Sequence, residues 1–479
     1  MIYLKRIKSY IKNENTHFLL MISIYLCLEL PFLTTIRPVM YDEAWYANTA
    51  SNFSIGKGFL NSIVGSGANA NFMLPLFTGI VFKFIGVSLF TARLVSVLSG
   101  LIFLLLMRKV FNLLSLDYNS QLISYYTVLF VPFFNTVFRF GRPECLALVF
   151  VIAAIYFYLK FLIYNNYISI VYISFFLLLA FLSHPFTSLF FLLIGIHLII
   201  IAIRNVDLKL FKYLIFFSII GVFALLIILL ANSYYNNHSF DLINSMNDMF
   251  KRTASTSETP ELLKDRIYSF SKSWLLSSKI IFSGPLILVV MSGILIKNLT
   301  VKYLSIISIC YIIFSFFLFK NDLEMFPLIF DYFLVFSVII LPFVYEYLKK
   351  KNIKLTITVF LLFLGLNLSA TLTYNIEKQE NINTTLQRDF KQIIPDTANV
   401  FGPIRFWFFL PKTNYISDHY RLNFPEISTF DYVITNSVDE KIYANYSYFH
   451  KRERMFKLIY STKSIQYGTI KVYKNTKVN

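Results

Sequence analysis

Long, nearly uncharged segments recur along the first three quarters of the chain, separated by polar loops. A helix that crosses a bilayer needs about 17–25 predominantly apolar residues, and these segments approach or reach that length. The pattern predicts eleven spanning helices, near residues 17–36, 90–107, 119–139, 145–163, 167–183, 186–203, 213–232, 276–296, 303–319, 326–345 and 355–374. We therefore expect residues 1–374 to form an α-helical polytopic membrane domain.

One further apolar segment, Asn71 to Gly86, is predicted not to cross the membrane. It is short and contains Pro75 and Lys83, which is typical of an interfacial or re-entrant helix. If it crossed, every later loop would change sides and the basic loops would lie outside, against the positive-inside rule.

Composition and charge support this topology. Of the 479 residues, 57% are hydrophobic and 15% are charged, which is more apolar side chain than a soluble domain can bury. The net charge of +18 falls largely in loops on one side, so it indicates orientation, and no nucleic-acid partner is expected. The basic clusters lie at residues 5–12, 108–109, 204–212, 297–302 and 349–354. We predict a multi-pass plasma-membrane protein with a cytoplasmic N-terminus, contacting membrane lipids and retaining its first segment as an anchor.

Beyond residue 374 the hydrophobic segments shorten and charged residues become frequent. Residues 430–434 and 468–474 are predicted strands, with a turn at Tyr467-Gly468. We expect residues 375–479 to form a small extracytoplasmic α/β or α+β domain, which either recognises an acceptor or acts as a structural cap. The three cysteines all lie in apolar spans, which indicates packing and neither disulfides nor a metal site.

Two adjacent carboxylates, Asp42 and Glu43, directly follow the first span on the predicted outer side, within an external loop at residues 37–89. The lowered dielectric at the membrane edge strengthens the interactions of a carboxylate and raises its pKa towards general-base catalysis. Alternatively, both are solvated residues in the first turn of an interfacial helix, where negative charge complements the helix dipole.

Other ionisable groups lie on the same predicted side, at the ends of other spans: Arg142, Glu144, His184, Asp322 and Glu324. Their concentration on one face indicates a functional cavity. Each also has a structural alternative. The arginine could snorkel, Glu144 could complement a helix start, His184 could be a hydrogen-bonded helix-end residue, and the last two could be ordinary loop residues.

Glu29 lies inside the first span, where a charge is functional by default, but its nearness to the outer boundary favours snorkelling or protonation. The external loop at residues 233–275 has a polar run followed by a candidate surface helix at 261–274. It is either a mobile lid over the cavity or a plain connection.

Several motifs together resemble the N-terminal signature of membrane-embedded GT-C glycosyltransferases, and look most like the branch of protein O-mannosyltransferases and bacterial lipid A aminoarabinose transferases. They are Tyr41-Asp42-Glu43-Ala44-Trp45-Tyr46-Ala47-Asn48, Gly56-Lys57-Gly58-Phe59, Leu74-Pro75-Leu76 leading to Gly86, Ala92-Arg93-Leu94, Gly141-Arg142-Pro143-Glu144 and Leu182-Ser183-His184-Pro185. The motifs cover about the first 200 residues. Later residues resemble the family in architecture only.

The resemblance implies transfer of a sugar from a polyprenyl-phosphate donor to a protein, lipid A or glycan acceptor on the outer face. It implies that Asp42 is the general base, and a carboxylate can accept the proton that an attacking hydroxyl loses. The remaining candidates serve the substrates. Glu43 is the second catalytic candidate. The substrate-binding candidates are Tyr41, Tyr46, Lys57, Arg93, Arg142, Glu144 and His184. The cations and the histidine would lie near the phosphate, and the carboxylates would orient the sugar or the cations.

The sequence departs from the family pattern at two positions. Met73-Leu74-Pro75 replaces a motif with a polar residue, and Asp331-Tyr332 stands where relatives have Arg-Tyr. Both changes affect the donor contacts and leave Asp42 untouched. No cofactor is assigned and no metal-ligand spacing is present, although the Asp-Glu pair could hold a divalent cation together with phosphate oxygens.

Two other classes of protein remain. A lipid or lipid-linked glycan transporter would share the hydrophobicity and the basic loops, but it should show inverted repeats around a site at the membrane midplane. The sequence shows no such repeat. A non-catalytic membrane scaffold would tolerate the loss of Asp42.

Overall fold

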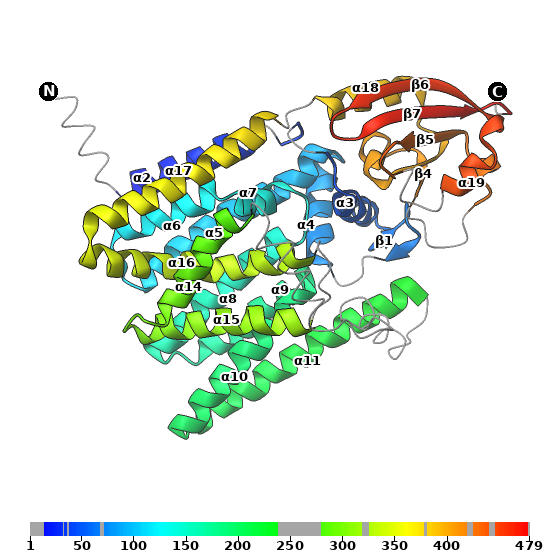
Figure 1. Cartoon of the computed structure of the whole chain (residues 1–479). Helices are drawn as coiled ribbons and strands as arrows, with labels where there is room; N and C mark the ends of the chain where they lie inside the picture. Colours follow the sequence, from blue (N-terminus) through cyan, green and yellow to red (C-terminus); the bar gives the residue numbers. More distant parts are fainter. Residues whose placement is uncertain are drawn as a thin grey trace.

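The computed structural model describes residues 14–31, 33–35, 38–67, 71–237, 279–318, 325–377, 381–418, 425–439 and 446–477. A helical bundle forms most of the molecule, and a small sheet domain lies at one end of it, next to α3 (Figure 1). The helices of the bundle are α2 (Glu14–Glu29), α3 (Tyr41–Ser54), α4 (Met73–Ile85), α5 (Leu89–Leu113), α6 (Tyr118–Phe130), α7 (Pro132–Arg139), α8 (Glu144–Tyr164), α9 (Ile168–Ser183), α10 (Ser188–Asn205), α11 (Leu208–Asn237), α14 (Lys279–Gly293), α15 (Leu299–Leu318), α16 (Met325–Lys351) and α17 (Ile353–Glu377).

Each of the eleven predicted spans overlaps a described helix or helix pair, but the first, predicted at 17–36, is helical only to Glu29. Seven of the described helices are long and apolar enough to cross a membrane, and a bent pair would make eight. Two predicted spans, at 167–183 and 276–296, correspond to the shorter apolar helices α9 and α14, and residues 276–278 lie outside the described part. The chain is therefore a multi-pass membrane protein.

The predicted span at 119–139 is not one continuous helix. It consists of α6 and α7, which meet at an angle of 62°. Pro132 explains the break, because proline lacks a backbone N–H and disfavours helical geometry in the residue before it. The Asn135 side chain donates to the carbonyl of Leu129 at 3.0 Å, which satisfies an acceptor near the break.

The segment that was predicted to stay out of the membrane forms α4, a helix of 13 residues that is shorter than a span. Gly79 in α4 packs against α3, where an added Cβ would lie 2.7 Å from the Phe53 ring and 2.8 Å from the Ala50 carbonyl oxygen. This close approach of the two helices needs a glycine.

The C-terminal domain begins with α18 (Ile382–Ile393) and contains a five-stranded sheet in the order β4-β3-β5-β7-β6. Its strands are β3 (Asn399–Gly402), β4 (Asn414–Ser417), β5 (Tyr432–Asn436), β6 (Phe456–Ser464) and β7 (Gly468–Asn475), and a short helix, α19 (Tyr446–His450), precedes β6. Strand β3 pairs in parallel with β4 and β5, whereas β7 is antiparallel to β5 and β6. The two predicted strands are present, and Gly468 has a φ of 72° at the turn before β7.

Two hydrophobic clusters organise these parts. The larger fills the helical bundle. The second joins the two parts of the molecule, because Ala44 and Ala47 of α3 share it with Trp407 and Phe408 of the 3₁₀ helix η3 (Ile404–Phe409). A two-stranded hairpin, β1 (Leu60–Asn61) with β2 (Ser66–Gly67), follows α3. Helix α3 thus joins the other helices of the bundle to the C-terminal domain (Figure 1).

Candidate active site

Helix α3 begins at Tyr41 and carries Asp42 and Glu43 in its first turn. Adjacent residues of an α-helix point in directions about 100° apart, so the two carboxylates face different surroundings. The Asp42 side chain is 52% exposed, whereas the Glu43 side chain is fully buried. The Asp-Glu pair therefore consists of one accessible carboxylate and one internal carboxylate.

Asp42 is at one end of a chain of charged and polar groups. Its Oδ2 lies 3.2 Å from Nη2 of Arg142, and the same nitrogen lies 3.0 Å from Oε1 of Glu144. Oε1 of Glu144 is in turn 3.8 Å from Nε2 of His184. The sequence-predicted residues Asp42, Arg142, Glu144 and His184 are therefore brought together from three separate segments.

The surroundings of Asp42 raise the pKa of its carboxyl group. About half of the side-chain surface is accessible. The protein atoms packed around the other half reduce the hydration of the charged form, and this desolvation raises the pKa of the carboxyl above its ordinary value. Arg142 opposes the rise, and the negative charges of Glu144 and Glu43 add to it. A carboxylate with a raised pKa is a stronger base than an ordinary aspartate.

His184 follows the end of α9 and is nearly buried, with its side chain 10% exposed. Burial lowers the pKa of its imidazole to about 3, and the positive charge of Arg142 acts in the same direction. The ring is therefore neutral near pH 7. It also contacts the aromatic rings of Phe186 and Tyr332, with centroid distances of 4.8 and 5.7 Å. We expected His184 to supply positive charge near the phosphate, but a buried, neutral ring carries none.

Glu43 and Arg93 form a closed ion pair. The Nε and Nη2 atoms of Arg93 donate to the two oxygens of Glu43, both at 2.8 Å, and both side chains are fully buried. Glu43 also accepts the backbone N–H groups of Met40 at 2.9 Å and Gly141 at 3.0 Å. The remaining Arg93 hydrogen bonds are to the carbonyls of Leu33 and Pro38.

This pair joins the start of α3 to α5 and to the segment before α8. Because the Met40 N–H precedes the first turn of α3, its bond to Glu43 satisfies a donor that the helix itself cannot. In this structure neither Glu43 nor Arg93 reaches accessible space, and Glu43 holds the backbone at Met40 and Gly141, next to the segments that carry Asp42 and Arg142.

Three further candidates lie in different surroundings. The Tyr46 hydroxyl accepts a hydrogen bond from the Asn71 side chain at 2.5 Å, and burial raises its pKa, with Asp42 and Glu144 adding to the rise. Lys57 is exposed in the loop after α3. Tyr41 was expected to bind substrate, but its hydroxyl donates to Asp439 and the Arg405 guanidinium carbon lies 4.2 Å from its ring centroid. Tyr41 is thus engaged with the C-terminal domain.

Two features were missed in the sequence. Glu29 forms a buried ion pair with Arg139 at the end of α7, with 2.7 Å between Oε2 and Nε. This pairing replaces the expectation of snorkelling or protonation. Opposite charges inside two predicted spans were a usable signal for it. The contact of Tyr41 with Asp439 and Arg405 had no such signal, because the partners lie in different domains.

Some predictions lie outside the described residues. Asp322, Glu324 and residues 238–275 of the external loop are among them, as is the Asp331 side chain. Within the described part, no group of three or more His, Cys, Asp or Glu residues is arranged to hold a metal ion. The hypothesis that the Asp-Glu pair holds a divalent cation together with phosphate oxygens stays a prediction.

Two solved structures share this architecture. The crystal structure of ArnT from Cupriavidus metallidurans bound to undecaprenyl phosphate matches with a TM-score of 0.63 and 11% sequence identity, over 95% of this chain and 97% of that chain. ArnT from the same organism in the apo state matches with a TM-score of 0.58, at the same identity and coverage. No family model and no curated protein matches the sequence. The similarity shows that the chain has the ArnT fold, so the predicted fold class is confirmed.

Proposed function

We propose that this protein is a membrane glycosyltransferase that moves a sugar from a polyprenyl-phosphate donor to an acceptor on the extracytoplasmic face, with Asp42 as the general base. The observation that carries the proposal is the accessible Asp42 carboxylate, with its raised pKa, beside the Arg142 guanidinium in a chain with the ArnT fold. One of the two ArnT structures is bound to undecaprenyl phosphate, which supports a polyprenyl phosphate as the donor lipid.

In the proposed reaction an acceptor hydroxyl oxygen attacks the anomeric carbon of the sugar, and the bond from that carbon to the phosphate oxygen breaks. Asp42 accepts the hydroxyl proton, and the bonding electron pair leaves with the lipid phosphate. A base within hydrogen-bond reach of the hydroxyl typically contributes a factor of about 10²–10⁴ in rate.

Arg142 serves the leaving group. The phosphate gains negative charge as the bond breaks, and a guanidinium stabilises such charge through directed hydrogen bonds. Arg142 is 18% exposed and lies between the carboxylates of Asp42 and Glu144, at 3.2 and 3.0 Å. Glu144 is nearly buried and orients this guanidinium. His184 is neutral and serves as a polar neighbour of Glu144.

The orientation belongs to the same proposal. The positive-inside pattern of the basic loops supports a cytoplasmic location for that side, and the proposal puts Asp42, Arg142 and the C-terminal domain on the opposite side. The acceptor is a protein, lipid A or a glycan, and the domain at residues 375–479 is well placed to contact it, because its buried residues pack directly against α3. Aminoarabinose is the first sugar to test, because this chain shares its fold with ArnT.

The test compares purified wild type with Asp42→Asn in lipid vesicles, supplied with undecaprenyl-phosphate-linked aminoarabinose, mannose and other hexoses, and with membrane extract as acceptor. We expect sugar transfer by wild type and a loss of about 10²-fold or more in Asp42→Asn. The matched control is Asp396→Asn, since Asp396 is also an accessible carboxylate, 62% exposed and 3.7 Å from Lys412, but lies in the C-terminal domain.

Equal rates for Asp42→Asn and an active wild type would remove Asp42 from the mechanism. If wild type leaves every donor unchanged but moves the lipid-linked sugar across the vesicle bilayer, the transporter alternative replaces the glycosyltransferase. Thermal unfolding of each purified variant shows whether a lost activity reflects chemistry or loss of the fold.

A further inference from the structure

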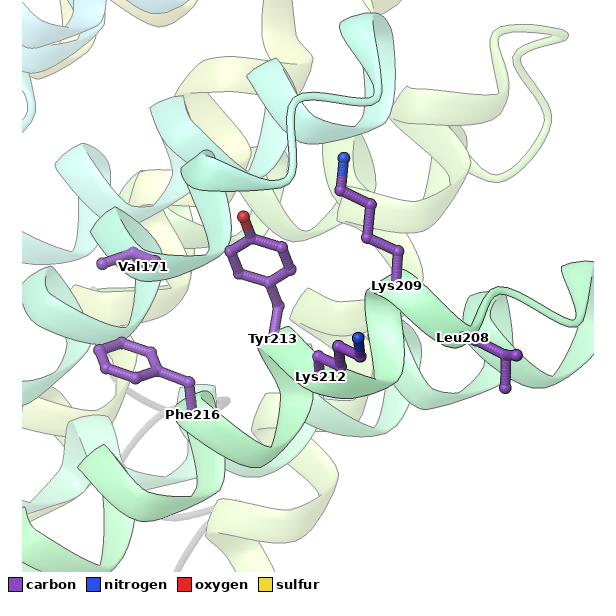
Figure 2. A pocket seen from close by; sticks show the side chains of 6 residues that line it. All are labelled: Val171, Leu208, Lys209, Lys212, Tyr213 and Phe216. Atoms are coloured by element: carbon purple, nitrogen blue, oxygen red, sulfur yellow. The ribbon is translucent and has the colours of Figure 1, made fainter.

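A pocket of about 680 Å³ lies between α9 and α11, at the end of the bundle that carries the basic loops (Figure 2). Its lining residues are Val171, Leu208, Lys209, Lys212, Tyr213 and Phe216. Asp42 follows the opposite end of the first span, so by the topology of the spans this pocket belongs to the other membrane face. The proposed sugar transfer makes no use of it.

One end of the pocket is cationic. Lys209 and Lys212 lie in the first turns of α11 and are exposed. Figure 2 shows Lys209 and Tyr213 extending to the same side of α11. The Lys209 ammonium lies 4.7 Å from the centroid of the Tyr167 ring, which holds it at the pocket rim. Two lysines and a tyrosine therefore line this end of the pocket.

A neighbouring acid, Asp207, is held by hydrogen bonds at the start of α11. Asp207 accepts the Tyr167 hydroxyl at 2.5 Å and the backbone N–H of Leu210 at 2.9 Å. These hydrogen bonds keep the pKa of Asp207 below its ordinary value. Within the described residues, no ion pair joins Asp207 to Lys209 or Lys212. The acid therefore anchors the start of α11 mainly through hydrogen bonds, and the Lys209 charge adds to the lowering of its pKa from beyond ion-pair distance.

The other end of the pocket is apolar. Phe216 lies seven residues after Lys209, about 10 Å deeper along the helix axis, and Figure 2 shows it near Val171 of α9. Large side chains next to these residues also face outward, with Tyr172 45%, Phe175 50% and Ile215 63% exposed. In a spanning helix such side chains face lipid hydrocarbon. The pocket is therefore polar at the membrane surface and apolar towards the membrane interior.

We propose that this pocket binds an anionic phospholipid of the cytoplasmic leaflet, with the phosphate between Lys209 and Lys212 and an acyl chain along Phe216 and Val171. Basic pockets between spanning helices on the cytoplasmic side have the chemistry that recognises such headgroups. The positive-inside pattern alone explains two lysines at the cytoplasmic start of a helix. It does not explain a hollow of this size that joins them to an apolar wall. Leaflet lipids are also the most concentrated anions at this position.

The test measures binding of fluorescent phosphatidylglycerol to the full-length protein in neutral detergent, with fluorescent phosphatidylcholine as the zwitterionic comparison. We expect saturable binding of phosphatidylglycerol, weakened roughly thirtyfold in Lys209→Ala/Lys212→Ala, or about fivefold per lysine. The matched control is Lys297→Ala/Lys302→Ala, which removes the same charge from the loop between α14 and α15 and the start of α15. Phe216→Ala should weaken binding without changing the preference for the anionic headgroup.

Three results would overturn the proposal. Equal weakening by the two double substitutions would show that binding follows total positive charge. An unchanged affinity in Lys209→Ala/Lys212→Ala would place the lipid elsewhere. Competition by glycerol phosphate as strong as that by phosphatidylglycerol would identify a site for soluble anions. Thermal unfolding of both double variants checks the fold. None of these three results depends on sugar transfer.

Discussion

The hydroxyl of Tyr41 donates a hydrogen bond to Oδ1 of Asp439, which lies 398 residues later in the chain. The same oxygen accepts Nη2 of Arg405 at 3.1 Å, and the Asn436 side chain donates to Oδ2 at 2.7 Å. Tyr41 directly precedes Asp42. The C-terminal domain therefore holds the first turn of the helix that carries the proposed base.

Asp439→Ala should destabilise the protein strongly, because it leaves the Arg405 guanidinium, 11% exposed, without its buried partner. Breaking such a pair costs about 3–5 kcal/mol, whereas Tyr41→Phe should cost about 1–3 kcal/mol. The measurement is thermal unfolding of the purified protein in detergent. The double variant Tyr41→Phe/Asp439→Ala should lose less than the sum of the single losses. Strict additivity would mean that the two residues do not interact in solution.

The pH dependence of transfer should show the raised pKa of Asp42. A base acts only when deprotonated, so kcat/KM should rise with pH through the Asp42 pKa, above the ordinary aspartate range. Arg142 favours the charged carboxylate, so Arg142→Gln should move this acid limb to higher pH. Arg142→Lys keeps the charge and should leave the limb near its wild-type position. If the acid limb of the kcat/KM profile stays at the same pH in Arg142→Gln, the group that titrates there is not Asp42.

Glu43→Gln should destabilise the protein by about 3–5 kcal/mol, because the fully buried Arg93 charge loses its carboxylate partner. Glu43→Gln/Arg93→Met should recover part of this loss, since no unpaired charge remains. The control is Glu426→Gln, which breaks an ion pair 2.8 Å long between side chains about half exposed, and should cost about 0–1 kcal/mol. Thermal unfolding distinguishes the three variants. Similar losses for Glu43→Gln and the control would contradict a structural role for the pair.

His184→Gln should retain transfer activity within about tenfold of wild type, because a neutral imidazole supplies a polar contact and no charge. Its pKa of about 3 also means that no imidazole titration should appear between pH 5 and 8. The measurement is the pH profile of kcat/KM for both proteins. Loss of a limb near pH 6 to 7 in His184→Gln would show that the ring titrates and carries charge during turnover. His184→Arg, which places a second cation near Arg142, serves as the disruptive comparison.

Much of this molecule could be predicted from local sequence. Hydrophobic length determines where helices can span, and every predicted span falls on a helix. The Asp42-Glu43 motif and the polar groups at Arg142, Glu144 and His184 were identified from residue type and predicted side. They meet in the structure because their segments end at the same face of the bundle.

Other features depended on contacts that local patterns do not encode. The break at Pro132 was missed because the apolar run continues through it, although proline interrupts the helical hydrogen bonds. The different roles of Asp42 and Glu43 depend on which way each side chain points from α3, and the motif treats the two residues alike. Arg93 was grouped with substrate cations, but its side chain is enclosed by Glu43 and two backbone carbonyls.

The sequence by itself determined that the chain is a polytopic membrane protein with a small C-terminal domain, and it located the Asp42-Glu43 pair. These properties follow from hydrophobic length, charge distribution and short motifs, which are all local in the chain. Only the tertiary structure decided which ionisable groups pair: Glu43 with Arg93, Glu29 with Arg139, and Tyr41 with Asp439. Burial and the direction of each side chain set these pairings, and both arise only when segments far apart in the chain pack together.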